Sequence, residues 1–319
     1  WDVLRYELTS FVCEGEYQRG LVRVLSTYLT HLAKPKQPAV WVSGFYGSGK
    51  SHFVRVLQYL WNNVTLPDGA QARGLIKLPV ELNDLLVELS GEGVRHGGLW
   101  AAAGKLGTSP NIHLDILRIL FRSAGLPVEV APARLVTWLK LKGIYDAVAA
   151  GVSQRGADLA FELANMHVSL ELAESIHDAY PGLAADATAV SDKLQAEFPG
   201  KSAIDDDELL QVMADVLRLQ SKTPGKLPLT LLVLDEMQQS IGEQPDRALA
   251  VQEIVEACST RFGSRILFVG TGQAALEATP QLSKLQDRFT VRVALEDKDV
   301  ERVVREVVLR KAPDKVANL

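Results

Sequence analysis

The sequence predicts an α/β protein with a parallel sheet flanked by helices. Three continuous apolar runs favour this class, because strands buried on both faces of a sheet lack the alternation of half-exposed strands. Each run ends in polar or glycine-rich residues and is followed by a helical pattern, which is the order of βαβ units. The runs are residues 39–43, 229–234 and 266–269.

The chain before the first run is predicted to be an N-terminal helical segment, residues 1–38. Apolar residues recur at helical spacing between Leu21 and Leu29. Pro35 and Pro38 then end the helix and lead into the first strand.

A glycine-rich loop follows this strand. Residues 44–51 read Gly-Phe-Tyr-Gly-Ser-Gly-Lys-Ser, which matches the phosphate-binding pattern G-x-x-x-x-G-K-[ST]. Glycines let backbone N–H groups turn toward phosphate oxygens, and the next helix adds its positive N-terminal end. We expect Lys50 to reach the β- and γ-phosphates of ATP and the Ser51 hydroxyl to bind Mg²⁺. The expected ATP-binding residues are Gly44, Tyr46, Gly47, Ser48, Gly49, Lys50, Ser51 and His52.

The middle of the chain is predicted to be a large helical insertion. We expect the second strand at 85–89, with 75–80 as the alternative, and find no strand signal in 91–228. Helical periodicity returns at 112–124, 132–150, 155–178 and 186–198, and Asp205 with Glu208 forms a capping pattern before a further helix. The predicted core is therefore 39–90 with 229–296, and the insertion is 91–228.

Part of this insertion is strongly acidic. Residues 161–210 contain eleven acidic residues against Lys193 and Lys201, a net charge of −9. Solvated helix faces are the default interpretation of such a run, and a docking surface for a basic partner is the alternative.

Polar residues follow the two later strands. Asp235 and Glu236 come after run 229–234, where an acid of a phosphate-loop ATPase holds Mg²⁺ and a following Glu orients the attacking water. The carboxyl ends of buried parallel strands face the crevice where ligands bind. Thr271 and Gln273 follow the next strand and are candidate sensors of the γ-phosphate, with a simple polar turn as the alternative.

An arginine precedes the last expected strand, residues 290–295. Arg288 is a candidate for stabilising transition-state charge at the γ-phosphate of a neighbouring subunit, which implies a homo-oligomer. A structural surface arginine is the alternative, and Arg292 is a less favoured substitute. Asp297 and the valines after it predict that residues 297–319 begin a helical lid domain.

Composition and charge bear on the location of the protein and on the metal it uses. The 319 residues carry a net charge of −5, two distant cysteines and no histidine or cysteine pair at zinc spacing. No apolar stretch approaches the roughly 18 residues of a membrane span, and no signal peptide is visible. We therefore expect a cytoplasmic protein without a membrane partner and with Mg²⁺ as its metal. Because the chain begins with Trp1, we also expect a piece of a longer polypeptide.

The order of these motifs resembles AAA+ ATPases, especially the origin-recognition-like branch. Several longer runs are similar to the BREX phage-defence ATPases (the BrxC and PglY family), although Ser240 stands where that family has an aromatic residue. The similar runs are Trp41 to Phe53, Leu234 to Gln239, Ile241-Gly242 and Gly272 to Leu276.

The resemblance implies a cytoplasmic ATPase, a phosphoric anhydride hydrolase, that works with other phage-defence proteins and acts on DNA. It assigns functional roles to Lys50, Ser51, Asp235, Glu236 and Arg288. Two other functions stay open: a nucleotide-dependent switch or scaffold with little hydrolysis, and an origin-recognition-like loader that binds DNA directly. A steep salt dependence of DNA binding would favour the loader, whereas the acidic net charge disfavours it.

Overall fold

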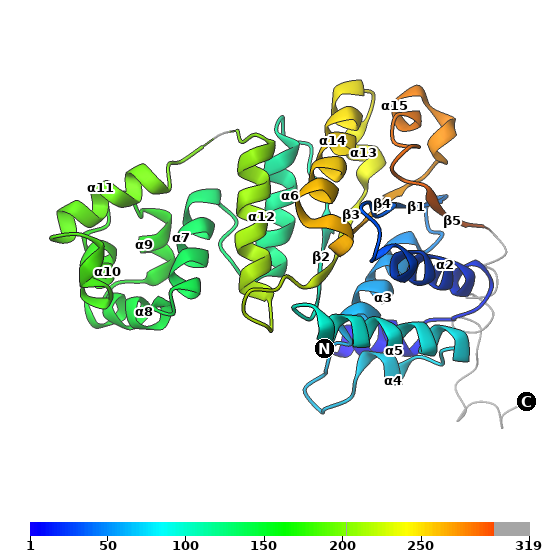
Figure 1. Ribbon diagram of the computed structural model, residues 1–319, viewed down its shortest axis with the longest axis horizontal. Helices are drawn as coiled ribbons and strands as arrows, with labels where there is room; N and C mark the ends of the chain where they lie inside the picture. Colours follow the sequence, from blue (N-terminus) through cyan, green and yellow to red (C-terminus); the bar gives the residue numbers. More distant parts are fainter. Residues whose placement is uncertain (202, 297–319) are drawn as a thin grey trace, which may run out of the picture. The chain divides into compact units, whose positions relative to one another are not determined.

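A parallel sheet of five strands forms the centre of one part of the chain (Figure 1). The structure, a computed structural model, describes residues 1–201 and 203–296. The strand order is β2-β3-β4-β1-β5, and each neighbouring pair runs parallel, so the predicted α/β class with a parallel sheet is confirmed. The strands are β1 (Val40–Gly44), β2 (Leu99–Lys105), β3 (Leu229–Asp235), β4 (Ile266–Gly272) and β5 (Val291–Leu295).

Both faces of this sheet are buried. Every residue of β4 is buried, and β3 is buried up to Leu234. Leu231 and Val233 of β3 belong to one core cluster, whereas the alternate residues Leu232 and Leu234 are buried outside it, because successive side chains of a strand point to opposite faces. This double burial is the physical reason for the continuous apolar runs in the sequence.

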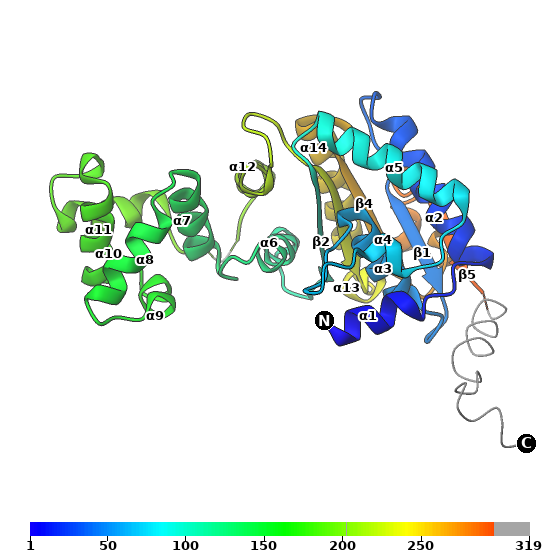
Figure 2. The ribbon, with the colours of Figure 1, turned by 90° about the horizontal axis from the view of Figure 1, so that it is seen from below.

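Helices cover the two faces. The core cluster joins α2 (Gly15–His31), α3 (Lys50–Asn62) and α5 (Val80–Arg95) to one face, while α14 (Pro245–Phe262) contacts β4 with residues outside that cluster (Figure 2). The N-terminal segment is helical, as predicted. The shorter helices are α1 (Asp2–Thr9), α4 (Ala72–Leu75), α13 (Met237–Ile241) and α15 (Pro280–Ser283), with 3-10 turns at Gly263–Arg265 and Leu276–Ala278.

The prediction of the second strand is wrong. Residues 85–89 lie within α5, where Leu82, Leu86 and Leu89 are buried at helical spacing. The alternative, 75–80, is not a strand either. The actual strand β2 contains three consecutive alanines, which have low β propensity, and its place is decided by pairing with β3 along its whole length.

A second unit consists of helices. Contacts group residues 109–224 into this helical unit, and residues 1–108 with the chain from Gly225 into the sheet unit. The helical unit starts later than the predicted residue 91 because β2 belongs to the sheet. The expectation of no strand in 91–228 is wrong, because β2 lies within this range; among the described residues of the helical unit, 109–201 and 203–224, the structure has no strand. The helices are α6 (Ile112–Ser123), α7 (Val130–Leu141), α8 (Tyr145–Gln154), α9 (Leu159–Ala164), α10 (Leu170–Ala179), a 3-10 turn (Pro181–Leu183), α11 (Ala187–Glu197) and α12 (Asp206–Gln220).

Side-chain caps begin most of these helices. The predicted cap of α12 is confirmed, because the Glu208 amide donates a hydrogen bond of 2.9 Å to the Asp205 carboxylate. Asn111, Asp158, Ser169 and Asp186 accept equivalent bonds at other helix starts. Each such cap satisfies an amide that the helix itself leaves free.

The predicted lid, residues 297–319, lies outside the described residues. Within the described part of the chain, none of the helices combines the length and apolar character required to cross a membrane.

Candidate functional site

The ends of three adjacent strands meet around one cavity of the sheet unit. Strand β4 pairs with β1 on one side and with β3 on the other, so their carboxyl ends open at the same edge. The cavity has a volume of about 270 Å³, and we call it the strand-end cavity. Its lining residues are Tyr46, Gly47, Gly49, Lys50, Ser51, His52, Asp235, Glu236, Gln238, Gln239, Thr271, Gly272 and Gln273.

The loop after β1 depends on its glycines. Gly47 and Gly49 have left-handed φ angles of +87° and +82°, which side chains with a Cβ rarely adopt. A Cβ on Gly44 would lie 2.5 Å from the Ser48 hydroxyl. Gly49 is also the N-cap of α3 and supplies no side-chain cap, so the first amides of this helix stay available to an anion.

Tyr17 of α2 holds the loop from behind. Its hydroxyl donates a hydrogen bond of 2.8 Å to the Ser48 carbonyl, and a Cβ on Gly49 would lie 2.6 Å from the same hydroxyl. The Ser48 side chain is fully buried, and its own hydroxyl has no hydrogen-bond partner within the described part of the chain. The backbone of the loop is thus fixed by a helix that precedes it by some thirty positions in the chain.

Lys50 is folded onto the loop itself. Its ammonium donates to the carbonyls of Gly44 at 2.7 Å and Phe45 at 2.9 Å. Partial burial lowers the Lys50 pKa, and the nearby charge of Asp235 acts in the opposite direction. The amine is therefore held at the wall of the cavity, close enough to Asp235 to feel its charge.

Asp235 is oriented by the next strand. Thr271 of β4, which is 1% exposed, donates from its hydroxyl to Asp235 Oδ1 at 2.6 Å. The Glu236 amide donates to the same carboxylate oxygen at 3.0 Å and to the Thr271 hydroxyl at 2.9 Å. These three groups form a closed hydrogen-bonded set, which limits how the Asp235 carboxylate can turn.

Glu236 has an unusual backbone and a basic partner. Its φ of +55° and ψ of +29° are left-handed, a conformation that costs a non-glycine residue about 1–3 kcal/mol and is frequent at functional sites. Its carboxylate forms an ion pair of 2.5 Å with Lys105, the last residue of β2. The hydrogen bond to Glu236 raises the pKa of Lys105. Lys105 was not among the predicted site residues, because the strand that ends in it was not predicted.

Gln238 fixes the end of β4 and was also missed as a site residue. Its side-chain oxygen accepts hydrogen bonds from the backbone amides of Gln273 at 2.6 Å and Ala274 at 2.9 Å. The backbone at Gln273 is therefore anchored while its side chain lines the cavity. Its place two residues after Glu236 gave no signal of this role.

His52 and Tyr46 reach the strand-end cavity in different ways. His52 donates from Nε2 to the Glu7 carbonyl at 2.9 Å and packs edge-on against Phe11, so one ring nitrogen is already used. Tyr46 is 89% exposed at the rim. The structure thus places both residues at the cavity, although His52 also connects α3 to the N-terminal segment.

Arg288 does not reach the cavity of its own chain. Its carbonyl accepts from the Ala39 amide, just before β1, so it lies at the amino end of the sheet rather than the carboxyl end. Its guanidinium forms an ion pair of 2.5 Å with Glu256. Two hydrogen bonds lower the pKa of Glu256: the one from Lys36 has the larger effect, and the one from Arg288 has the smaller effect. Arg292 is paired with Glu277 and is also absent from the cavity lining.

The metal ligands expected from the sequence lie together. Ser51 and Asp235 both line the strand-end cavity. In the described part of the chain there is no group of three or more His, Cys, Asp or Glu residues that could hold a metal ion alone.

A scan of the chain against models of known protein families gives no match. No solved structure matches the chain either.

Proposed function

We propose that the sheet unit binds ATP with Mg²⁺ and hydrolyses it. One observation carries this proposal: a single cavity gathers the glycine-rich loop, the acid pair Asp235-Glu236 and the polar strand end at Thr271. A loop with open amides, a lysine and two acids at the carboxyl ends of parallel strands suits a nucleotide phosphate chain.

Lys50 and the loop amides bind the phosphates in this proposal. The Lys50 ammonium now donates to two loop carbonyls, and phosphate oxygens offer it stronger, charge-assisted hydrogen bonds. The left-handed glycines keep the loop open beneath these oxygens. Tyr46 and His52 contribute to the wall of the cavity, and the buried Ser48 belongs to the loop backbone behind it.

The donor set also fits Mg²⁺. This ion prefers one or two protein oxygens together with substrate phosphates and water, which agrees with Ser51 and Asp235 as the only two protein ligands we assign among the described residues. Bound there, Mg²⁺ neutralises charge on the phosphates. The Thr271 hydroxyl keeps the Asp235 carboxylate turned for this role.

Glu236 orients the attacking water and accepts its proton in this proposal. Its ion pair with Lys105 must loosen for the carboxylate to act. Thr271 and Gln273 report the γ-phosphate from the end of β4. Arg288 serves the cavity of a neighbouring subunit, since it is remote from its own, and full activity then requires a homo-oligomer.

Two substitutions test the proposal. Lys50→Ala should abolish measurable ATP binding by calorimetry, whereas Glu236→Gln should keep binding and lose turnover. Lys142→Ala, at an exposed position of the helical unit, is the control and should leave both unchanged. If Glu236→Gln turned over ATP normally while Lys50→Ala did not, the catalytic role of Glu236 would be wrong.

A switch with little hydrolysis is the second candidate. The ion pair between Glu236 and Lys105 favours it, because the Lys105 ammonium occupies the carboxylate that would orient the attacking water. Turnover measured across protein concentration separates the two functions. A rise with concentration supports a hydrolase completed by Arg288 of a neighbour, and negligible turnover at all concentrations supports the switch.

We further propose, on the resemblance of residues 41–53 and 234–239 to BREX ATPases, a cytoplasmic role in bacterial phage defence with other defence proteins and DNA. Neighbouring genes for a methyltransferase and a phosphatase-like protein would support this role. Without such neighbours the proposed ATPase activity stands, but the defence role does not.

A further inference from the structure

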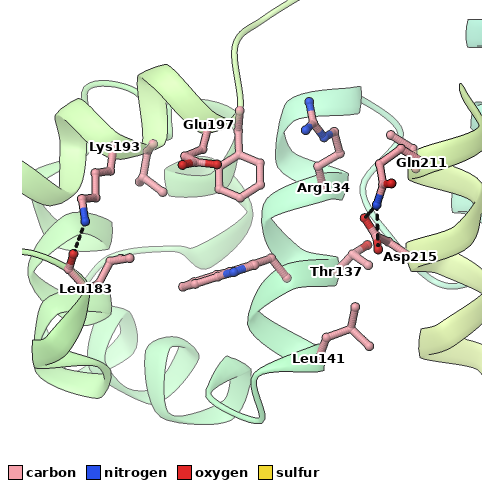
Figure 3. A pocket seen from close by; sticks show the side chains of 12 residues that line it. Arg134, Thr137, Leu141, Leu183, Lys193, Glu197, Gln211 and Asp215 are labelled. Carbon is pink, nitrogen blue, oxygen red and sulfur yellow. Dashed lines mark hydrogen bonds between the residues drawn. The ribbon is translucent and has the colours of Figure 1, made fainter. Parts of the chain in front are cut away.

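The helical unit contains a cavity of its own, of about 360 Å³, which we call the helical-unit cavity. This volume lies within the range of small-ligand sites. Figure 3 shows Lys193 and Glu197 on one side of it and Arg134, Gln211 and Asp215 on the other. The lining residues are Arg134, Thr137, Trp138, Leu141, Leu183, Lys193, Leu194, Glu197, Phe198, Gln211, Val212 and Asp215.

An aromatic group forms part of its wall. The Trp138 ring lies 6.2 Å from Tyr180 and 6.4 Å from Phe198, centroid to centroid. Leu194 and Val212 are buried beside the cavity and extend the apolar surface. An indole face in such a setting attracts a cation that comes within about 6 Å of the ring.

Most charged groups of the wall already have partners. Arg134 forms an ion pair of 3.2 Å with Glu208 and lies over the Phe198 ring. Asp215 forms an ion pair of 2.5 Å with Arg218. These pairs leave little net charge on their side of the cavity.

Glu197 is different. Its side chain is exposed and belongs to the cavity lining, and its carboxylate has no ion pair or hydrogen bond to another described residue. Lys193 lies one helical turn before it, but the Lys193 ammonium donates to the Leu183 carbonyl (Figure 3). The cavity therefore combines an indole face with an unpartnered carboxylate.

The whole helical unit has the same sign of charge. Residues 109–224 contain sixteen Asp and Glu against ten Lys and Arg, a net charge of −6 with His neutral. The rest of the chain has twenty-four Lys and Arg against twenty-three Asp and Glu. The acidic charge of the protein is thus concentrated on the unit that holds this cavity, which attracts a basic partner over distance.

We propose that the helical-unit cavity receives an arginine or lysine side chain from a basic peptide segment of a partner protein. The apolar stem of that side chain lies against Trp138 and Leu194, and its cationic end meets Glu197. The acidic surface of the unit contacts further basic residues of the peptide. This inference does not depend on ATP binding, because every residue it uses lies in the helical unit.

Fluorescence gives a direct test, because Trp138 is the only tryptophan of residues 109–224. The full chain is titrated with an alanine-rich peptide that carries a central arginine between lysines. We expect a saturable change in tryptophan emission that Trp138→Phe removes. Replacing the central arginine by citrulline keeps the shape, removes the charge and should weaken binding about tenfold. Equal binding of the citrulline peptide would overturn the proposal.

Substitutions on α11 test whether the Glu197 carboxylate binds the cationic side chain of the peptide. Glu197→Gln should weaken binding of the arginine peptide about three- to fivefold, whereas Asp192→Asn, the same change of charge on the same helix outside the cavity, should change it less than twofold. Lys193→Gln should strengthen binding, because it removes a competing cation. Weaker binding by Lys193→Gln, or an equal loss for both acids, would show that the cavity is not a cation site.

Two further measurements distinguish a peptide from a small cation and test whether the two cavities are independent. Arginine amide alone should bind at least tenfold more weakly than the peptide, and equal affinity would identify a small cation rather than a protein segment as the occupant. Lys50→Ala should bind the peptide normally. A loss of peptide binding in Lys50→Ala would contradict the independence of this site from the strand-end cavity.

Discussion

The strand-end cavity and the helical-unit cavity differ in what positions their lining residues. In the strand-end cavity, backbone geometry and hydrogen bonds do so: left-handed glycines, the ends of β1, β3 and β4, and the Thr271 to Asp235 bond. In the helical-unit cavity, packing between helices does so, with Trp138 and Leu194 as the walls. A site made at strand ends leaves a local pattern in the sequence, whereas a cavity made between helices does not.

The largest effect we expect is on turnover by the strand-end cavity. Glu236→Gln should lower the ATP hydrolysis rate by about 10²–10⁴-fold, the usual contribution of a general base. Peptide binding to the helical unit should be unchanged. Steady-state phosphate release and the fluorescence titration measure the two. A loss of both would show that the two cavities do not act independently.

Backbone geometry can be tested at one glycine. Gly49→Ala should weaken ATP binding about ten- to a hundredfold, because the left-handed φ and the Tyr17 hydroxyl 2.6 Å from the added Cβ both oppose alanine. Gly91→Ala is the matched control, since no atom lies within 4 Å of its Cβ and its φ is not left-handed. Calorimetric titration with ATP measures both. Equal affinities would mean that the loop tolerates another conformation.

Removing a helix cap tests the stability of the helical unit separately from ATP binding. Asp205→Ala should lower the free energy of unfolding by about 1 kcal/mol, because it removes the acceptor of the Glu208 amide at the start of α12. Asp192→Asn is the control on a helix surface. Urea unfolding followed by circular dichroism measures the change, and ATP affinity should stay constant. A fall in ATP affinity would show that the stability of the helical unit affects the strand-end cavity.

The smallest expected effect concerns Lys105. Lys105→Ala should raise the turnover rate about two- to fivefold, because it frees the Glu236 carboxylate from an exposed ion pair of modest strength. Lys105→Arg keeps the charge and should change the rate less. Single-turnover measurements separate this effect from ATP binding. A large fall in rate would instead give Lys105 a direct role at the phosphates.

Much of the fold was predictable because its signals are local. The apolar runs of β1, β3 and β4 come from burial of both sheet faces, and the cap at Asp205 comes from unsatisfied helix amides. Strand β2 was not predictable, because its alanines have no strand preference of their own. The leucines at 85–89 were mistaken for a buried strand, although Leu82, Leu86 and Leu89 have helical spacing.

The candidate site divides in the same way. Asp235 and Thr271 lie at the carboxyl ends of β3 and β4, and Lys50 begins the helix after β1, so the parallel order of the sheet brings them to one cavity. Lys105 and Gln238 act through contacts with residues distant in the sequence or with backbone groups of another strand. No spacing rule marks such partners.

Local patterns in the sequence are sufficient for the parallel α/β class, the glycine-rich loop and the helical character of residues 109–224, because hydrophobic period, glycine conformation and helix caps act over a few residues. Three contacts became visible only in the folded chain: Lys105 pairs with Glu236, Arg288 lies at the opposite end of the sheet, and Trp138 and Glu197 share a cavity. These contacts depend on strand pairing and helix packing, which join residues whose separation in the chain carries no information about their distance in space.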